Sequence, residues 1–373
     1  MAKRKHGIRG AGSVYLRKDG RYAAEIKLDG KRKTVYGKTE KEAYQKMQQA
    51  LYEHRQGTLI TGPQQTVKQF LEYWLENVQK PLIREITYSL NRGIIYKHIM
   101  PDLGQIKLRD LKPEHIEKLY AKMLKAEYNP SSIGHTHGIL RSALNQAVKR
   151  GLLARNVCDI VSPPRSHKHE VTSLTINQAQ KLIQVAKGHR LEALLIVAIT
   201  TGMRRGELLA LRWQDVDFET KRLYVRRSVN RIVGHGIVEG EPKTMNSKRT
   251  ITLPQVVLDA LKQHKANQEE TKRKVGTLWK DRNLVFPNTQ GNYEEATHLR
   301  TMFLKFLRDA ELPSIRFHDL RHSAASILLS LGVNPKVIQE LLGHSKVSMT
   351  LDVYSHVLPG MQSDAMDKWN DLM

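Results

Sequence analysis

Cysteine is almost absent from this chain of 373 residues, in which Cys158 stands alone. No disulfide can join two parts of such a chain, so we expect a reducing cytoplasm and not a disulfide-stapled secreted protein. One cysteine and scattered histidines also give none of the usual zinc-ligand spacings. No apolar stretch follows residues 1–5, and the longest one, around residues 194–199, is far shorter than the roughly 20 residues of a membrane span. We therefore expect neither a metal site, nor a signal peptide, nor a membrane-spanning segment.

Acidic residues are scarce relative to basic ones. The sequence has 37 Asp and Glu against 61 Lys and Arg, which gives a net charge of +24 and an isoelectric point near 10.0. A surplus of this size repels itself unless a polyanion is close, and Lys and Arg at phosphates release condensed counterions. The charge favours a nucleic-acid partner and a cytoplasmic, nucleoid-associated protein. A basic protein that binds acidic proteins or membrane surfaces is the alternative.

Residues 1–60 read as a small module of three strands and one helix. Strand-like runs at 13–16, 22–28 and 33–36 are separated by Asp19-Gly20 and Asp29-Gly30, and Asp-Gly between alternating runs is a strong hairpin signal. Thr39, with Glu42 three residues on, predicts a helix start. A ribbon of this size fits a DNA major groove. The residues around its hairpin that would suit DNA contact are Lys27, Lys31, Arg32 and Lys33. A solvated basic surface is the other interpretation.

Residues 65–162 read as a helical bundle. Apolar periodicity and capping residues predict helices from Thr66, at about 87–99 with an end before Pro101, from Pro113, and over 130–150. Basic side chains that could contact DNA phosphates from this bundle are Arg92, Arg141 and Lys149. A solvated face is again the alternative for each of them. Residues 163–174, rich in proline and basic residues, predict an interdomain linker.

Residues 175–373 form the largest predicted domain. Helices are expected at 176–186, at 190–200, from about 204 and again beyond 254, and strands at 223–225 and 250–253. The intervening 234–240 reads as a loop. The chain as a whole is thus expected to be multidomain and mainly α-helical, with small β-sheets.

Three short motifs in this last part carry the chemistry. They are Thr201-Gly202-Met203-Arg204-Arg205-Gly206-Glu207, His318-Asp319-Leu320-Arg321, and Leu341-Leu342-Gly343-His344 followed ten residues later by Tyr354. Each is weak alone, but their order and spacing together resemble the boxes of the tyrosine recombinases, the integrases of phages and conjugative elements. The resemblance covers essentially the whole chain. It implies an arm-type DNA-binding domain at 1–60, a core-binding helical domain at 65–162, and a mixed α/β catalytic domain with a C-terminal helical tail at 175–373.

The resemblance also implies a role for each motif residue. Tyr354 would be the nucleophile, and the guanidinium groups of Arg204 and Arg321 would bind the non-bridging oxygens of a DNA phosphate, which planar paired donors suit. His318 would donate a hydrogen bond or accept the tyrosine proton, and His344 would bind a non-bridging oxygen.

Two further positions are assigned on the same ground. Glu207 would hold a catalytic side chain in place, or form an ordinary helix ion pair. The leaving 5′-oxygen needs a proton, for which Lys243 is chosen and Lys248 is the runner-up.

The implied function is site-specific recombination for the integration and excision of a mobile element, through a 3′-phosphotyrosine intermediate and a Holliday junction. The expected partner is double-stranded DNA, at core and arm sites. The resemblance implies a homotetramer on DNA, no cofactor, no ATP and no membrane. A directionality factor or a host bending protein is a further possible partner, and the C-terminal tail packs either on its own domain or on a neighbour. The alternatives are a catalytically inactive DNA-binding protein on the same scaffold and a type IB topoisomerase.

Overall fold

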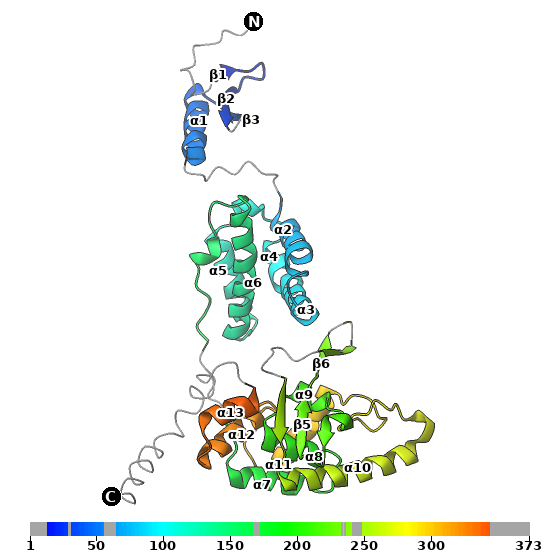
Figure 1. Ribbon diagram of the computed structural model, residues 1–373. Coiled ribbons are helices and arrows are strands. Elements are labelled where there is room, and N and C mark those ends of the chain that lie inside the picture. The colour runs from blue at the N-terminus through cyan, green and yellow to red at the C-terminus, as the bar shows by residue number, and fades with distance from the viewer. Residues whose placement is uncertain are drawn as a thin grey trace, which may run out of the picture. The chain divides into compact units, whose positions relative to one another are not determined.

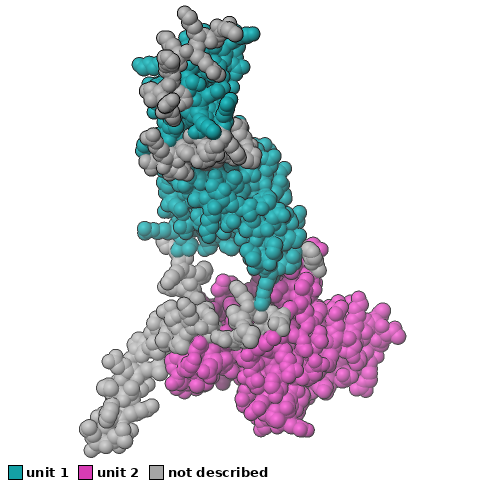
Figure 2. Space-filling model, turned by 45° about the horizontal axis from the view of Figure 1, so that its top comes forward, with its two compact units in different colours: residues 1–168 teal, residues 169–373 magenta. Residues whose placement is uncertain are grey.

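The computed structural model describes residues 13–28, 31–55, 65–166, 172–232, 234, 236–240 and 248–343 (Figure 1). The chain divides into two compact units, residues 1–168 and 169–373, which are coloured separately in Figure 2. Helices predominate and the sheets are small, so the predicted fold class is confirmed. Among the described helices, none is both long enough and apolar enough to cross a bilayer.

The N-terminal module is an antiparallel sheet packed on one helix, as predicted. Its elements are β1 (Ser13–Leu16), β2 (Tyr22–Leu28), β3 (Lys31–Gly37) and α1 (Glu40–Arg55). Gly20 adopts a φ of 78° in the first hairpin turn, and the hydroxyl of Thr39 accepts the backbone N–H of Glu42 at the start of α1. The small core between sheet and helix consists of Ala24, Ile26, Ala43, Met47 and Ala50. The second predicted turn, Asp29-Gly30, lies outside the described residues.

Residues 65–162 form the predicted helical bundle. Its elements are α2 (Val67–Trp74), η1 (Leu75–Gln79), α3 (Glu85–Ile94), η2 (Ile95–Ile99), α4 (Met100–Leu103), η3 (Leu108–Asp110), α5 (Pro113–Lys125), α6 (Pro130–Lys149) and η4 (Val157–Asp159). A capping box at Thr66 starts α2, and Cys158 is buried in the bundle core. The helix predicted at 87–99 was expected to end before Pro101, and this prediction is wrong. In the π-helical turn η2, the backbone N–H of Met100 donates to the carbonyl of Ile95. Pro101 then lies in the first turn of α4, where a missing backbone N–H costs no hydrogen bond.

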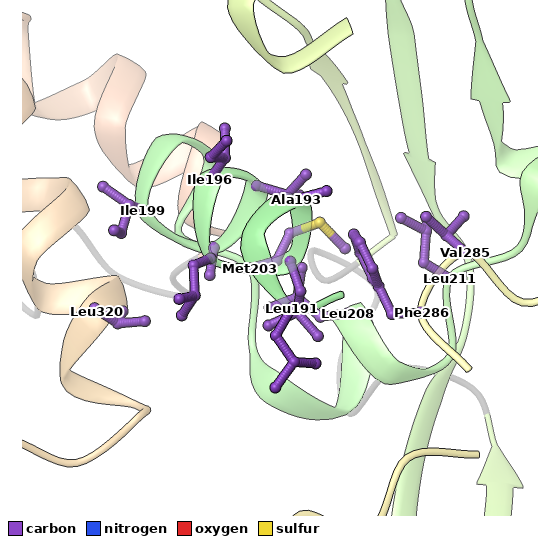
Figure 3. Packing of buried hydrophobic residues seen from close by; sticks show 14 of the residues in the cluster. Leu191, Ala193, Ile196, Ile199, Met203, Leu208, Leu211, Val285, Phe286 and Leu320 are labelled. Carbon is purple, nitrogen blue, oxygen red and sulfur yellow. The ribbon is translucent and has the colours of Figure 1, made fainter. Parts of the chain in front are cut away.

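The second unit contains the remaining elements. They are α7 (Ile176–Val185), α8 (Glu192–Thr201), α9 (Arg205–Leu209), η5 (Trp213–Asp215), β4 (Val216–Asp217), β5 (Arg222–Val225), β6 (Ser228–Ile232), β7 (Gly236–Gly240), β8 (Arg249–Thr252), α10 (Gln255–Val275), η7 (Gly276–Leu278), α11 (Ala296–Asp309), α12 (Asp319–Ser330) and α13 (Pro335–Leu342). The helix α8 is apolar along nearly its whole length and lies inside the core, as expected of a helix that is hydrophobic all round. Figure 3 shows Ala193, Ile196 and Ile199 of this helix together with other side chains of the same core cluster, Leu191, Met203, Leu208, Phe286 and Leu320.

Two small sheets complete this unit, with strand orders β4-β5-β8 and β6-β7. The predicted strands at 223–225 and 250–253 are confirmed as β5 and β8, apart from the last residue. The loop predicted at 234–240 is wrong for residues 236–240, which pair as β7 with β6. Leu174, assigned above to the linker, is 1% exposed in the core, and its N–H bonds to the Ser323 hydroxyl on α12. The packed core of the second unit therefore includes this residue.

Candidate active site

The first motif lies at the junction of α8 and α9. Gly202 ends α8 in the left-handed conformation, with a φ of +60°, and its carbonyl accepts a hydrogen bond of 2.9 Å from Arg321 Nη1 on α12. A Cβ at Gly202 would lie 2.3 Å from Leu342 Cδ2 and 3.3 Å from Ala324 Cβ. Glycine here thus lets the end of α8 pack directly on α12 and α13, and Arg204 follows two residues later.

Gly202→Ala is expected to lower the free energy of unfolding by about 3 kcal/mol. Left-handed backbone costs an alanine about 1–2 kcal/mol, and crowding in a packed core adds about 1–3 kcal/mol. Gly188→Ala is the matched control, because its φ is +76° but nothing lies within 4 Å of the added Cβ. Urea unfolding of both variants measures the difference. Equal losses would show that contact with α12 and α13 adds nothing.

Glu207 links the first motif to β8. Its Oε1 accepts Arg204 Nη1 at 2.8 Å, and its Oε2 accepts the Arg204 backbone N–H at 3.0 Å and Arg249 Nη2 at 3.0 Å. The carboxylate is only 2% exposed. Burial alone would raise the pKa of Glu207, but the charges and hydrogen bonds of Arg249 and Arg204 hold it below its usual value. Glu207 is therefore an ionised bridge between two guanidinium groups.

Both guanidinium groups also reach the C-terminal end of α13. Arg249 Nε donates to the carbonyl of Leu341 at 2.6 Å, and Arg204 Nη2 donates to that of Gly343 at 3.2 Å. The last carbonyls of a helix lack partners within it, so these contacts satisfy them. His344 is the next residue along the chain. The cluster of Glu207, Arg204 and Arg249 thereby fixes the point from which the third motif leaves α13.

Arg249 was not among the predicted site residues, although the sequence contains a signal for it. Residues 249 and 251 lie on the same side of β8, and Ile251 is 1% exposed in the core. A charged side chain with this parity must be buried, and a buried charge requires a partner. The partner, Glu207, is 42 positions away, so the sequence alone does not identify it.

The second motif lies at the N-terminus of α12. Arg321 is 3% exposed and bonds to Gly202, whereas His318 is the N-cap residue but makes no side-chain capping bond. The rings of His318 and His322 meet edge to face, 5.8 Å apart. Asp319 is engaged by Arg316, from whose backbone and guanidinium it accepts three hydrogen bonds. The structure thus brings Arg204, His318 and Arg321 into one neighbourhood.

The surroundings of His318 favour the neutral form of its ring. Its pKa is lowered to about 4, first by the loss of water around the partly covered ring and then by the positive charges of Arg321, His322 and Arg204. A neutral imidazole carries one N–H donor and one acceptor nitrogen. It can therefore either donate to a phosphate oxygen or accept a proton.

Lys243, His344 and Tyr354 lie outside the described residues. Lys248, the runner-up to Lys243, is exposed and lines an open groove with Tyr224, Arg226 and Arg227. The strand β7, three residues before Lys243, is held by Glu239, which contacts Arg212 at 2.9 Å, Arg227 at 3.4 Å and the hydroxyl of Tyr293.

The register of the N-terminal sheet separates the basic residues predicted to contact DNA. Lys27 pairs with Arg32 on the face away from α1, where Arg17 also stacks 5.2 Å from the exposed Tyr36 ring. Lys33 pairs with Ile26, on the side of the sheet that covers α1. The side chain of Lys31 lies outside the described residues. Lys27 and Arg32 therefore fit a DNA-contacting face, and Lys33 does not.

In the helical bundle, Arg92, Arg141 and Lys149 are all exposed. Arg141 Nε is 2.7 Å from Asp159 Oδ1, so this guanidinium already has a carboxylate partner. Arg92 stacks 5.4 Å from the ring of Tyr96. Of the three, Arg141 is the least suited to a DNA phosphate.

Comparison with known proteins gives a consistent result. Residues 172–360 match the Phage integrase family, and residues 66–124 match the phage integrase N-terminal SAM-like domain. The chain is 33% identical over 359 residues to a tyrosine recombinase XerC-like protein of Caldanaerobacter subterraneus subsp. tengcongensis, covering 91% of this chain and 92% of that protein. It is 28% identical to the ICEBs1 integrase of Bacillus subtilis, covering 77% and 78%.

Solved structures show the same fold. The Tn1549 transposon integrase in complex with transposon right end DNA superposes with a TM-score of 0.70 at 22% identity, covering 81% of this chain and 99% of that one. A lambda integrase tetramer bound to a Holliday junction superposes with a TM-score of 0.58 at 19% identity, covering 93% and 96%.

Proposed function

Because this chain belongs to the phage integrase family and is thus a site-specific DNA recombinase, we propose that it breaks and rejoins DNA through a covalent bond to Tyr354. The observation that carries this mechanism is the convergence of Arg204, His318 and Arg321 from the α8–α9 junction and from α12. Two guanidinium groups and a neutral imidazole match the donors that a phosphodiester requires as it gains negative charge.

In the first step the phenol oxygen of Tyr354 attacks the phosphorus atom, and the bond to the 5′-oxygen breaks. Arg204 and Arg321 bind the non-bridging oxygens, with His344 as a further donor. His318 takes the phenol proton or donates to the phosphate. Lys243 gives a proton to the leaving 5′-oxygen, with Lys248 as the alternative. The products are a 3′-phosphotyrosine and a free 5′-hydroxyl.

The second step reverses the first with a different strand. A 5′-hydroxyl attacks the phosphotyrosine, restores the phosphodiester and frees Tyr354. The energy of the broken bond is kept in the covalent intermediate, so neither ATP nor a cofactor enters the balance. Two rounds on two duplexes pass through a Holliday junction. The lambda integrase tetramer on such a junction supports four subunits of this chain as the working assembly.

The test is covalent trapping on duplexes cut from the ends of the mobile element, each nicked just 3′ of a candidate site so that the short fragment with the free 5′-hydroxyl diffuses away after cleavage. The protein is incubated with this DNA in the presence of a metal chelator. A covalent protein–DNA adduct should then appear on a denaturing gel. Binding without an adduct on any fragment would favour a catalytically inactive DNA-binding protein, and the proposal would fail.

We also assign residues 1–60 to arm sites and the rest of the chain to the core site. The face of the N-terminal sheet with Lys27 and Arg32 supports this division. Removing residues 1–60 should leave adduct formation at a core site within about threefold, because none of the proposed catalytic residues is lost. It should reduce complete recombination between two sites by more than tenfold. Gel assays of both reactions decide, and loss of core cleavage would refute the division.

A further inference from the structure

A pocket of about 470 Å³ opens beside His318 in the second unit. Three arginines, Arg205, Arg300 and Arg316, line it together with His318. Part of its wall is apolar: Ala296 and Leu304 are partly exposed there, and the buried Phe303 and Phe317 lie behind them. The mechanism above uses none of these residues except His318.

The charge and exposure of the arginines in this pocket suit the binding of an anion. Arg316 is held in place by its hydrogen bonds to Asp319, while its side chain is still 74% exposed. Arg205 and Arg300 are exposed, and neither forms an ion pair with a carboxylate in the described part of the chain. Asp319 also lines the pocket and offsets the charge of Arg316, but Arg205 and Arg300 keep their full positive charge, so a bound anion lowers their free energy.

We propose that this pocket, which we call the arginine pocket, binds the phosphodiester that neighbours the scissile phosphate on the cleaved strand. This inference rests on the proposed function, because it takes His318 to lie at the scissile phosphate. Successive phosphates of one strand advance by about 3.4 Å along the DNA axis. His318 lines this pocket and is also proposed to contact the scissile phosphate. The pocket therefore lies next to the scissile phosphate, where the adjoining nucleotide of the same strand would bind.

The apolar part of the wall fits the same ligand. A deoxyribose joins the two phosphates and has little polarity on its carbon face, so the partly exposed Ala296 and Leu304 suit it better than they suit a solvated ion. Arg205 directly follows Arg204 in the chain. Arg204 would bind the scissile phosphate and Arg205 the next phosphate. Together they would hold the strand in position for the attack of Tyr354.

The test combines arginine variants with a methylphosphonate scan of the DNA strand. A methylphosphonate removes the charge of one phosphate and keeps its size. In the unaltered protein, neutralising the neighbouring phosphate should weaken binding roughly tenfold, as expected for a charge-assisted hydrogen bond. In Arg300→Gln and in Arg205→Gln, neutralising the same phosphate should weaken DNA binding by less than about twofold. Arg308→Gln is the matched control. Arg308 is exposed on α11, the helix that also contains Arg300, but it does not line the pocket.

The position of the coupling decides the assignment. Coupling at a phosphate next to the one mapped by the covalent adduct supports the proposal, and coupling at no position, or two or more nucleotides away, overturns it. Displacement of DNA by inorganic phosphate, beyond the effect of chloride at equal ionic strength, would show a free-anion site and also overturn it. Where no adduct forms but one phosphate still couples to Arg300 and Arg205, the covalent mechanism fails and the pocket remains a DNA-phosphate site.

Discussion

Tyr354→Phe is expected to abolish the covalent adduct while leaving DNA affinity within about twofold. The substitution removes one oxygen atom, which is the proposed nucleophile, and keeps the ring. No other side chain should substitute for it, since attack requires an oxygen aligned with the leaving 5′-oxygen. A phenol has a pKa near 10 in water, and the guanidinium groups of Arg204 and Arg321 would favour the phenolate at the moment of attack.

The measurement is the trapping assay on nicked DNA, read together with a gel-shift titration. Tyr52→Phe serves as the matched control, because Tyr52 is 64% exposed in the N-terminal module, away from the motif residues in sequence. It should form the adduct at the rate of the unaltered protein. An adduct in Tyr354→Phe would mean that another residue is the nucleophile. Loss of both adduct and binding would mean that the tail containing Tyr354 is needed to hold DNA.

Local features of this chain could be predicted because their causes are local. The Asp19-Gly20 turn, the cap at Thr39 and the apolar face that begins at Val67 each depend on neighbours within about four residues. Arg204 and His318 are the N-cap residues of α9 and α12, but their roles were taken from the resemblance of the motifs and stay predictions.

Features that depend on distant partners could not be predicted in the same way. The strand β7 contains two glycines in five residues, and its pairing with β6 outweighs this weak propensity. Arg249 meets Glu207 across 42 positions, and Arg204 meets the carbonyl of Gly343 across 139. Such contacts depend on tertiary packing, so the sequence could name Arg204 and Glu207 but not the carbonyls and the second guanidinium that complete the cluster.

Glu207→Ala is expected to lower the free energy of unfolding by about 3–5 kcal/mol. Removing one member of a buried charged cluster leaves the others without compensation, and here both Arg204 and the 6%-exposed Arg249 lose their carboxylate. Chemical unfolding of the second unit measures this loss. Glu311→Ala is the control: Glu311 pairs with Lys181 at 3.3 Å but is 85% exposed, so its loss should cost below about 1 kcal/mol.

Glu207→Gln removes the negative charge of this side chain and keeps its shape. The effect of this variant on stability should therefore depend on pH. A carboxyl group whose pKa is lowered in the folded protein stabilises it above its ordinary pKa, here 4.5, and this contribution fades as the pH falls through the lower folded value. The stability difference between the unaltered protein and Glu207→Gln should therefore be full at pH 7 and shrink below about pH 4.5. A difference that is constant over this range would mean that Glu207 acts through shape alone.

The same variant connects stability to chemistry. Glutamine can still accept a hydrogen bond from Arg204, but it cannot neutralise two guanidinium groups. We expect adduct formation to fall by about 100-fold, comparable with the loss of one donor to the transition state, because both the aim of Arg204 and the exit of the chain toward His344 depend on the cluster. Binding at the arginine pocket should change little, since none of its arginines contacts Glu207. A loss of cleavage without a loss of affinity would place Glu207 among the residues that position the reaction centre, even though it never touches DNA.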